Sequence, residues 1–417
     1  MNVSRFGQKI ASTSGIGRLM EDLGNAMSQS SNTLMLGGGN PAHIPEVQKY
    51  FRDSIEKLLR DGSAFEKAIG NYDPPSGNIE FIEAVAKLLQ KEYGWNIKSK
   101  NIALTNGSQI AFFILFNIFA GTYKDKTEKK ILFPLTPEYI GYCDVGMTDD
   151  FFIAQKPVIE HEDEQIFKYH IDFENLKIDK SIGAVCVSRP TNPSGNVLTD
   201  HEIDRLSRLA SANNIPLIID NAYGLPFPNI IFTEIKSIWN ENIILCLSLS
   251  KLGLPSARTG IILANEEIID MVSKVNAVMS LAPGGMGPVI TTDLIKTGQI
   301  ISLSRNIIRP FYHNKAKISL ELAIRELNGI KFHIHKPQGT FFLWLWFPEL
   351  PITDTRLYEN LKQKNVLVVP GNYFFPGLKE NWPHKNQCIR VNYSQDSAIF
   401  RKGIKIIAEE VKIAYNV

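Results

Sequence analysis

The sequence of 417 residues has little cysteine, no long apolar run and almost no excess of either charge. Its four cysteines lie far apart, which excludes paired zinc-site spacing and favours reduced thiols in the cytoplasm. The longest apolar stretch, residues 110–120, is much shorter than the ~20 residues that cross a bilayer. The start of the chain shows no signal-peptide pattern. With 45 basic and 43 acidic side chains, we expect neither nucleic acid nor a membrane as a partner.

What the chain does have is a regular alternation of helical and strand patterns. From about residue 45, amphipathic stretches such as 51–62 and 79–94 alternate with short apolar runs. Strands separated by helices predict a mostly parallel sheet, and runs that are apolar on both faces predict helices on both sides. The predicted strands begin the stretches 101–107, 129–139, 182–195, 215–223, 242–251 and 260–267.

The pattern changes after about residue 290, where one long helical region precedes several short strands. We therefore expect an α/β protein whose large domain, residues 46–300, has a mostly parallel sheet flanked by helices. Residues 301–417 form a smaller α+β domain, and residues 1–45 form an arm that packs with it.

Polar residues follow the apolar runs, at the sheet edge where parallel sheets bind ligands. Gly107 and Ser108 open a helix whose N-terminus favours a phosphate, although Gly–Ser is also a common N-cap. Tyr139 follows the next strand and is either a stacking surface for a planar ligand or a half-buried turn residue. Asn192 has an amide that can donate to a ligand oxygen, but it also suits a turn.

A carboxylate and an amine end two further strands. Asp220 follows a wholly apolar run, where a carboxylate is costly to bury without a cation or a good donor, unless it is an N-cap. Lys251 ends another such run, and burial lowers the pKa of an ammonium. A lysine in that setting suits an amine nucleophile or a Schiff base.

Together these residues fit one cofactor, pyridoxal 5′-phosphate (PLP), whose protein partners are a lysine and an acid at the ring nitrogen. Lys251 would bond to the aldehyde carbon and Asp220 would face the protonated ring nitrogen. The ring would lie under Tyr139, and its oxygen would meet Asn192 and Tyr223. The phosphate would take Gly107, Ser108, Ser248 and Arg258.

At this point the chain resembles the fold type I PLP-dependent aminotransferases. The resemblance rests on "NPSG" at Asn192, "DNAY" at Asp220 and Tyr223, "SLSK" at Lys251, and the arginine at Arg258. It implies that Lys251, Asp220 and Tyr223 take part in catalysis. It adds Gln109 and Ser250 to the residues that bind the cofactor.

The resemblance also implies a substrate site and a homodimer. Arg390 in "CIRVNY" would hold the substrate α-carboxylate, with Asn192 and with Gly38 of "LGGGNP". Tyr72 in "NYDPPSG" would reach the phosphate of the partner subunit. One departure concerns the phosphate loop: Arg258 follows the lysine by seven residues, whereas many relatives have eight.

Passages such as "LGGGNPAHIPE" and "DNAYGLPFP" resemble a subgroup that exchanges amino groups between valine and pyruvate. We therefore expect a transaminase for an aliphatic amino acid. An aminotransferase of other specificity and a PLP-dependent C–S lyase remain alternatives, because Lys251 and Asp220 serve both reactions. A non-catalytic effector domain is disfavoured, since no DNA-binding motif precedes the predicted arm.

Overall fold

The computed structural model describes residues 2–11, 15, 17, 19–22, 24 and 32–416. The first helix of this part is α1 (Arg5–Ile10). The rest of the predicted N-terminal arm, up to residue 31, lies largely outside the described residues. No helix that the described residues form is long and apolar enough to cross a membrane.

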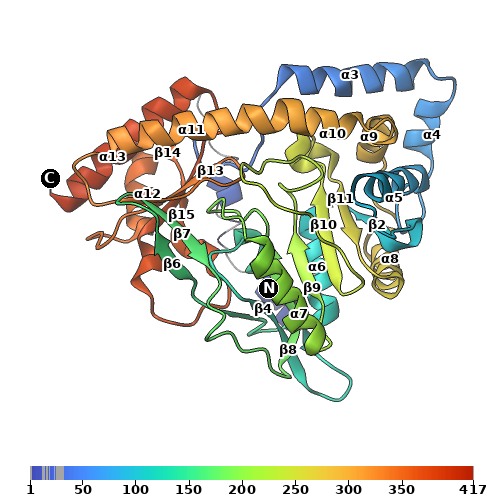
Figure 1. Cartoon of the computed structure of the whole chain (residues 1–417), viewed down its shortest axis with the longest axis horizontal. Coiled ribbons are helices and arrows are strands. Elements are labelled where there is room, and N and C mark those ends of the chain that lie inside the picture. Colours follow the sequence, from blue (N-terminus) through green and yellow to red (C-terminus); the bar gives the residue numbers. More distant parts are fainter. Residues whose placement is uncertain are drawn as a thin grey trace.

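The larger sheet has eight strands, and the central ones are parallel (Figure 1). Only β11 and the short β3 run antiparallel to their neighbours. This confirms the predicted α/β class with a mostly parallel sheet. The strand order is β2 (Ile102–Thr105), β11 (Gly260–Leu263), β10 (Ile243–Ser248), β9 (Leu217–Asp220), β8 (Ile182–Ser188), β4 (Glu128–Phe133) and β3 (Gly121–Thr122), with β5 (Phe152–Ala154) beside β4.

Helices cover both faces of this sheet because its strands are apolar on both sides. In β9, Leu217 and Ile219 pack into one core cluster and Ile218 packs into the other. The apolar stretch 110–120 forms a buried helix, α6 (Ser108–Phe119), as predicted. The other flanking helices are α5 (Ile79–Tyr93), α7 (Asp200–Ala212) and α8 (Glu266–Ser280).

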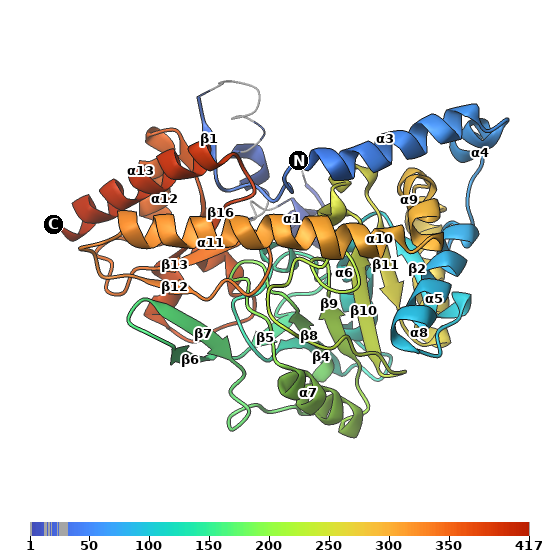
Figure 2. The same cartoon turned by 45° about the horizontal axis from the view of Figure 1, so that its top comes forward.

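A second, six-stranded sheet lies beside the first, and it draws residues from the middle as well as the end of the chain (Figure 2). Its parallel pairing of β12 with β7 brings residues 158–170 next to the C-terminal strands. The domain boundaries expected above stay a prediction. The order is β15 (Val369–Pro370), β16 (Cys388–Asn392), β13 (Phe342–Trp346), β12 (His333–His335), β7 (Ile166–His170) and β6 (Val158–His161).

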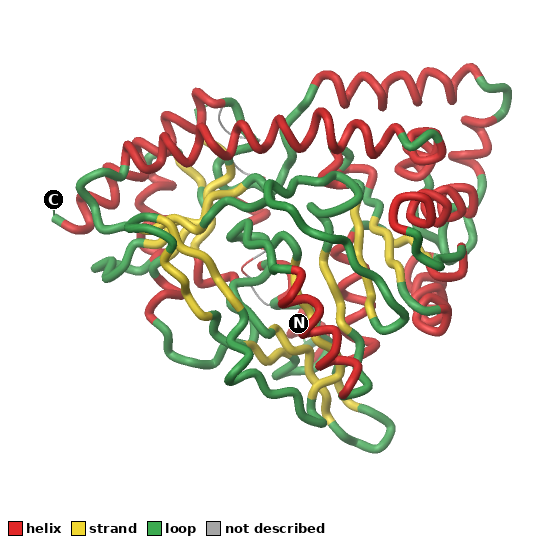
Figure 3. Tube along the Cα trace, in the orientation of Figure 1, coloured by secondary structure: helices red, strands yellow, loops and turns green. Residues whose placement is uncertain are grey.

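Long helices cross or border the two sheets, as the tube view shows (Figure 3). α11 (Arg309–Glu326) packs on β13 and on the C-terminal helix α13 (Ser397–Tyr415). The arm adds β1 (Leu34–Met35), which pairs with β14 (Val366–Leu367). The remaining α-helices are α3 (Pro45–Arg60), α4 (Ala64–Gly70), α9 (Met286–Lys296), α10 (Gln299–Leu303) and α12 (Asp354–Gln363).

Candidate active site

Residues at the strand ends of the larger sheet line a cavity of about 110 Å³. The sequence places a polar residue after each apolar run, and the parallel strands bring these residues to one edge. Nine of the predicted site residues line this cavity: Ser108, Gln109, Tyr139, Asn192, Asp220, Tyr223, Ser250, Lys251 and Arg258.

Gly107 and Arg258 are in direct contact at one end of this cavity. Gly107 has φ +90°, and a Cβ on it would lie 2.1 Å from Nη2 of Arg258. Gly107 is also the N-cap of α6 and offers no side chain to its first N–H groups. The N-terminus of α6 therefore combines backbone N–H groups that no capping side chain binds with the guanidinium of Arg258. This combination suits a phosphate.

The short connection from Lys251 to Arg258 contains two tight turns and two residues with positive φ. The turns are η3 (Ser250–Leu252) and η4 (Pro255–Ala257). Gly253 has φ +124° between them, and Arg258 adopts the left-handed region at φ +46°. Ser256 does not have a positive φ, so a residue with a side chain fits this position without backbone strain. The seven-residue spacing thus still delivers the guanidinium to the end of α6.

Among the described residues, the groups that donate to Asp220 are neutral. The hydroxyl of Tyr142 donates to its Oδ2 at 2.5 Å, and the N–H of Ala222 donates to Oδ1 at 2.9 Å. Burial raises the pKa of this carboxyl, and the charge of Lys251 opposes that rise. A buried carboxylate with no ion pair among the described residues fits a cationic ring nitrogen as its partner.

Lys251 faces the same cavity with most of its donor capacity unused. Its Nζ donates to the carbonyl of Gly39 at 2.8 Å and lies 5.4 Å from the ring centre of Tyr223. Burial lowers the pKa of Lys251 to about 8, and the nearby charge of Arg390 acts in the same direction. Such an amine is available as a nucleophile or base near neutral pH.

Arg390 reaches this region from β16 of the second sheet. Its Nη1 donates to Oδ1 of Asn192 at 2.8 Å, and Nη2 donates to the carbonyl of Gly37 at 2.6 Å. Its guanidinium carbon lies 4.1 Å from the ring centre of Phe342, and burial lowers its pKa to about 10. The neighbouring Gly38 has open space where a Cβ would stand. The arrangement presents a planar fork suited to a carboxylate.

Three buried polar atoms around the cavity have no hydrogen-bond partner among the described residues. They are Oη of Tyr223, Nε of Arg390 and Oε1 of Gln109. Buried polar atoms are nearly always paired, so unpaired ones in a cavity indicate where a ligand binds. A planar, anionic cofactor with a basic ring nitrogen matches the donors and acceptors present, and these residues fit PLP.

Two predicted residues lie apart from the cavity wall. The hydroxyl of Ser248 is buried and accepts the N–H of Ser250 at 3.1 Å. Tyr72 lies in the loop between α4 and α5, and 84% of its surface is exposed. Their roles in binding phosphate stay predictions.

Sequence reasoning missed two residues, Glu138 and Tyr142. Glu138 is buried, and both its oxygens bind Ser188, whose N–H donates at 2.9 Å. Burial raises the pKa of Glu138 to about 8, and the charge of Asp220 adds to this rise. Ser188 pairs with Asp220 across β8 and β9. The clustered motif "PEYIGY" was the only sequence signal, and it singled out Tyr139 alone.

Comparison with known proteins identifies the family. The model of the family "Aminotransferase class I and II" matches residues 30–405. The valine–pyruvate aminotransferase of Escherichia coli K12 is 51% identical over 100% of this chain and 99% of its own length.

Solved structures agree in fold and length. A putative amino-acid aminotransferase from Psychrobacter arcticum superimposes with a TM-score of 0.97 at 46% identity, covering 100% of this chain and 99% of the other. The valine–pyruvate aminotransferase of Salmonella typhimurium LT2 has a TM-score of 0.88 at 50% identity, covering 96% of this chain and 99% of the other. These matches confirm the fold type I aminotransferase fold and the PLP cofactor that the sequence predicts. The chain belongs to the class I and II aminotransferases and is a PLP-dependent transaminase.

Proposed function

We propose that this enzyme transfers an amino group from valine to pyruvate, giving 3-methyl-2-oxobutanoate and alanine. The observation that carries this proposal is the full-length similarity to the valine–pyruvate aminotransferase of Escherichia coli, at 51% identity. Similarity at that level, over 99% of the relative, extends beyond the cofactor motifs to the rest of the chain.

PLP, when bound, supplies a carbonyl for amine exchange and a ring that accepts electron density from the substrate. Lys251 is the residue that would hold it covalently, and the phosphate would lie at the end of α6. The residues predicted to bind the cofactor in that region are Gly107, Ser108, Gln109, Ser248, Ser250 and Arg258, with Tyr72 of the partner subunit. Tyr139 would support the ring plane, and Asn192 and Tyr223 would bind the ring oxygen.

Proton transfer falls to Lys251 and charge balance to Asp220. Because the pKa of Lys251 is lowered to about 8, a substantial fraction of its Nζ is neutral near that pH. Nζ can therefore take a proton from the substrate Cα and return it elsewhere, as a general base then acid. Asp220, with Tyr142 and Ala222 donating to it, keeps a negative charge that holds the ring nitrogen protonated.

The substrate carboxylate would bind between the two sheets. Arg390 supplies a guanidinium whose Nε has no partner among the described residues, and Asn192 lies next to it. Gly38 leaves room for the ligand beside them because it has no side chain. The guanidinium of Arg390 would bind the α-carboxylate, which all amino acids have. It would therefore orient the substrate without selecting one amino acid over another.

A second cavity, of about 270 Å³, borders the other side of Lys251. No carboxylate and no arginine of the described residues line it, and several aliphatic and aromatic side chains do. This surface supports an uncharged aliphatic substrate over a dicarboxylic one. Its apolar lining residues are Pro41, Ala42, Ile44, Val47, Phe51, Leu252, Pro255, Ile308 and Tyr312.

We further propose a homodimer in the cytoplasm. Tyr72, Val278 and Leu281 are exposed by 84%, 89% and 62%, which is unusual for large apolar or aromatic side chains on a free surface. A second copy that covers this face would bring Tyr72 to the neighbouring phosphate site. The four cysteines are all free thiols, which supports a reducing compartment.

A matrix of amino donors against keto acids tests the substrate assignment. Purified PLP-loaded enzyme would be offered valine, isoleucine, leucine, 2-aminobutyrate, aspartate and cysteine, each with pyruvate or 2-oxoglutarate. We expect alanine to form fastest from valine and pyruvate. Absence of alanine from that pair would contradict the assignment, and release of pyruvate and ammonia from cysteine alone would indicate a lyase.

A further inference from the structure

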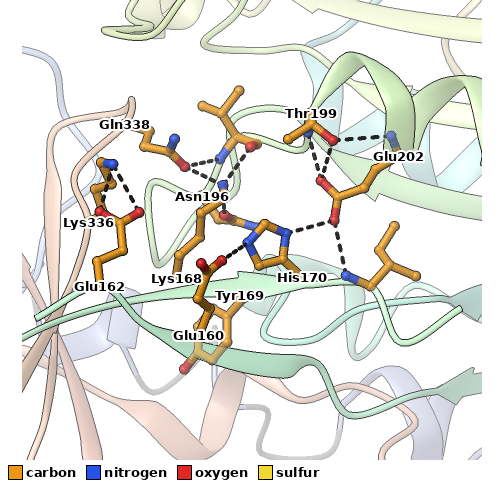
Figure 4. A network of polar contacts seen from close by, with 12 residues as sticks. Glu160, Glu162, Lys168, Tyr169, His170, Asn196, Thr199, Glu202, Lys336 and Gln338 are labelled. Carbon is orange, nitrogen blue, oxygen red and sulfur yellow. Dashed lines mark hydrogen bonds and ion pairs between the residues drawn. The ribbon is translucent and has the colours of Figure 1, made fainter.

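A second buried lysine, Lys168, lies away from the cofactor cavity on β7 of the smaller sheet. It is 5% exposed, and its Nζ donates to three uncharged oxygens (Figure 4). These are Oδ1 of Asn196 and the carbonyl of Val197, both at 2.9 Å, and Oε1 of Gln338. An ammonium has three N–H donors, so every donor of this lysine is in use.

Two of the three acceptors belong to the turn that carries Asn192. This turn follows β8 of the larger sheet and closes on itself. The N–H of Thr191 donates to the carbonyl of Asn196 at 2.8 Å, and the N–H of Gly195 donates to Thr191 at 2.7 Å. Lys168 therefore holds the base of a compact turn, and Asn192 lies within it.

The third acceptor belongs to the segment that leads into β13 and Phe342. This segment packs directly against the turn: a Cβ on Gly195 of the turn would lie only 2.6 Å from the carbonyl oxygen of Gly339 in the segment. Arg390 is held on one side by Asn192 and on the other by the ring of Phe342. Both of these supports come from segments that Lys168 joins.

The other polar contacts around Lys168 are of a different kind. His170 lies between Glu160 and Glu202, and Lys336 pairs with Glu162 (Figure 4). The contacts of Glu160 and Glu162 join partly exposed ionic groups and are worth little individually, whereas Glu202 is itself buried. Lys168 binds no carboxylate of the described residues directly. Burial lowers its pKa to about 8, and the nearest charges on neighbouring elements come from those same residues.

We propose that Lys168 is a positioning residue for the substrate carboxylate. It fastens the turn of Asn192 in the larger sheet to the segment of Phe342 in the smaller one. The guanidinium of Arg390 then stays aligned between them for the incoming carboxylate. This inference rests on the proposed role of Arg390 and deepens the proposed function, because it concerns how that one site is kept in shape.

The test replaces Lys168 with methionine, which keeps the side-chain length and removes all three donors. As probe we choose 3-methylbutanoate, which has the carbon skeleton of valine without the amino group, titrated into PLP-loaded enzyme and followed by cofactor absorbance. We expect its Kd to rise at least tenfold in Lys168→Met, with a parallel rise in the KM for valine and a smaller effect on kcat. In the cofactor-free protein, hydrogen exchange in residues 191–198 should become faster.

Two further variants keep the test decisive. Lys336→Met removes a lysine on the adjoining segment whose partner is the half-exposed Glu162, so it should leave the Kd within twofold of wild type. Gln338→Met removes one of the three acceptors of Lys168, together with the bond that the same oxygen accepts from the N–H of Val197 at 3.4 Å. It should raise the Kd by a few fold, and it tests the junction between turn and segment if Lys168→Met fails to fold.

The inference is overturned if Lys168→Met lowers the melting temperature but leaves the Kd and the exchange of residues 191–198 unchanged. An unchanged Kd in Gln338→Met would overturn it in the same way. An enzyme that binds 3-methylbutanoate but does not transaminate valine would contradict the proposed substrate alone, since carboxylate affinity would still report on Lys168.

Discussion

Lys168 is buried and Lys251 is partly buried, and desolvation lowers the pKa of both to about 8, yet their surroundings differ. Lys168 donates three hydrogen bonds to uncharged oxygens, whereas Lys251 donates one, to Gly39, and borders two cavities. A depressed pKa alone therefore does not distinguish a structural lysine from a reactive one. Free N–H donors beside a cavity do distinguish the reactive lysine, because an ammonium whose three N–H groups are all bonded has no donor left for a ligand.

The largest expected difference between the two lysines is in turnover. Lys251→Ala should reduce kcat at least 1000-fold, because the substitution removes both the covalent attachment and the proton carrier. Lys168→Met should change kcat by less than threefold, since Lys168 touches neither cofactor nor substrate. Steady-state kinetics with valine and pyruvate measure both effects.

Circular dichroism of both variants provides the control for folding. Lys251→Ala should also lose the visible absorbance of the lysine-bound cofactor while keeping the far-ultraviolet spectrum of the wild type. Normal activity in Lys251→Ala would contradict the site as a whole. Equal losses of kcat in both variants would break the distinction between the lysines.

The second expected difference is in stability: replacing each lysine with methionine should change the free energy of unfolding in opposite directions. In cofactor-free protein at pH 7, Lys251→Met should raise the free energy of unfolding by roughly 1 kcal/mol, because it removes a poorly compensated buried charge. Lys168→Met should lower it by about 1–3 kcal/mol, because oxygens of Asn196, Val197 and Gln338 lose their donor. Urea denaturation gives both values. A destabilised Lys251→Met variant would show that this ammonium is better compensated than its single hydrogen bond indicates.

The same contrast explains how far the sequence could predict the fold and the site. Lys251 stands out because it follows the apolar strand Ile243–Ser248 closely, and Asp220 because it ends Leu217–Asp220; both signals are local. Parallel strands then bring local signals to one edge, so the cofactor site could be predicted from strand ends. Six of the eight strands of the larger sheet follow from the same apolar runs, whereas the short edge strands β3 and β5 were not predicted.

Residues whose role depends on distant partners left no such signal. Lys168 stands in "IFKYH", where a lysine normally indicates a solvent-facing position. Its burial depends on Asn196 and Gln338, which lie 28 and 170 residues away in the sequence. Glu138 likewise depends on Ser188, 50 residues away. Contacts between segments that are distant in the sequence decide these positions, and no periodicity within one strand reports such contacts.

The smallest expected difference is in the pH dependence of stability, which follows from the two lowered pKa values. Each lysine has a folded-state pKa of about 8, below its unfolded value of roughly 10.4. Between these values the unfolded chain binds more protons, so each lysine's contribution to stability rises with pH. In cofactor-free protein from pH 7 to 9.5, the stability of the wild type should therefore rise to that of Lys251→Met, which starts more stable, and then exceed it.

The wild type should diverge from Lys168→Met over the same range, because that variant starts less stable and lacks the rising contribution of the lysine. Urea denaturation at four pH values, taken as differences between each variant and wild type, cancels the titration of groups that all three proteins share. We expect each difference to change by no more than about 1 kcal/mol per pH unit. Differences that stay constant across this range would show that both lysines titrate near their ordinary pKa. The lowered pKa that the comparison takes the two lysines to share would then be absent.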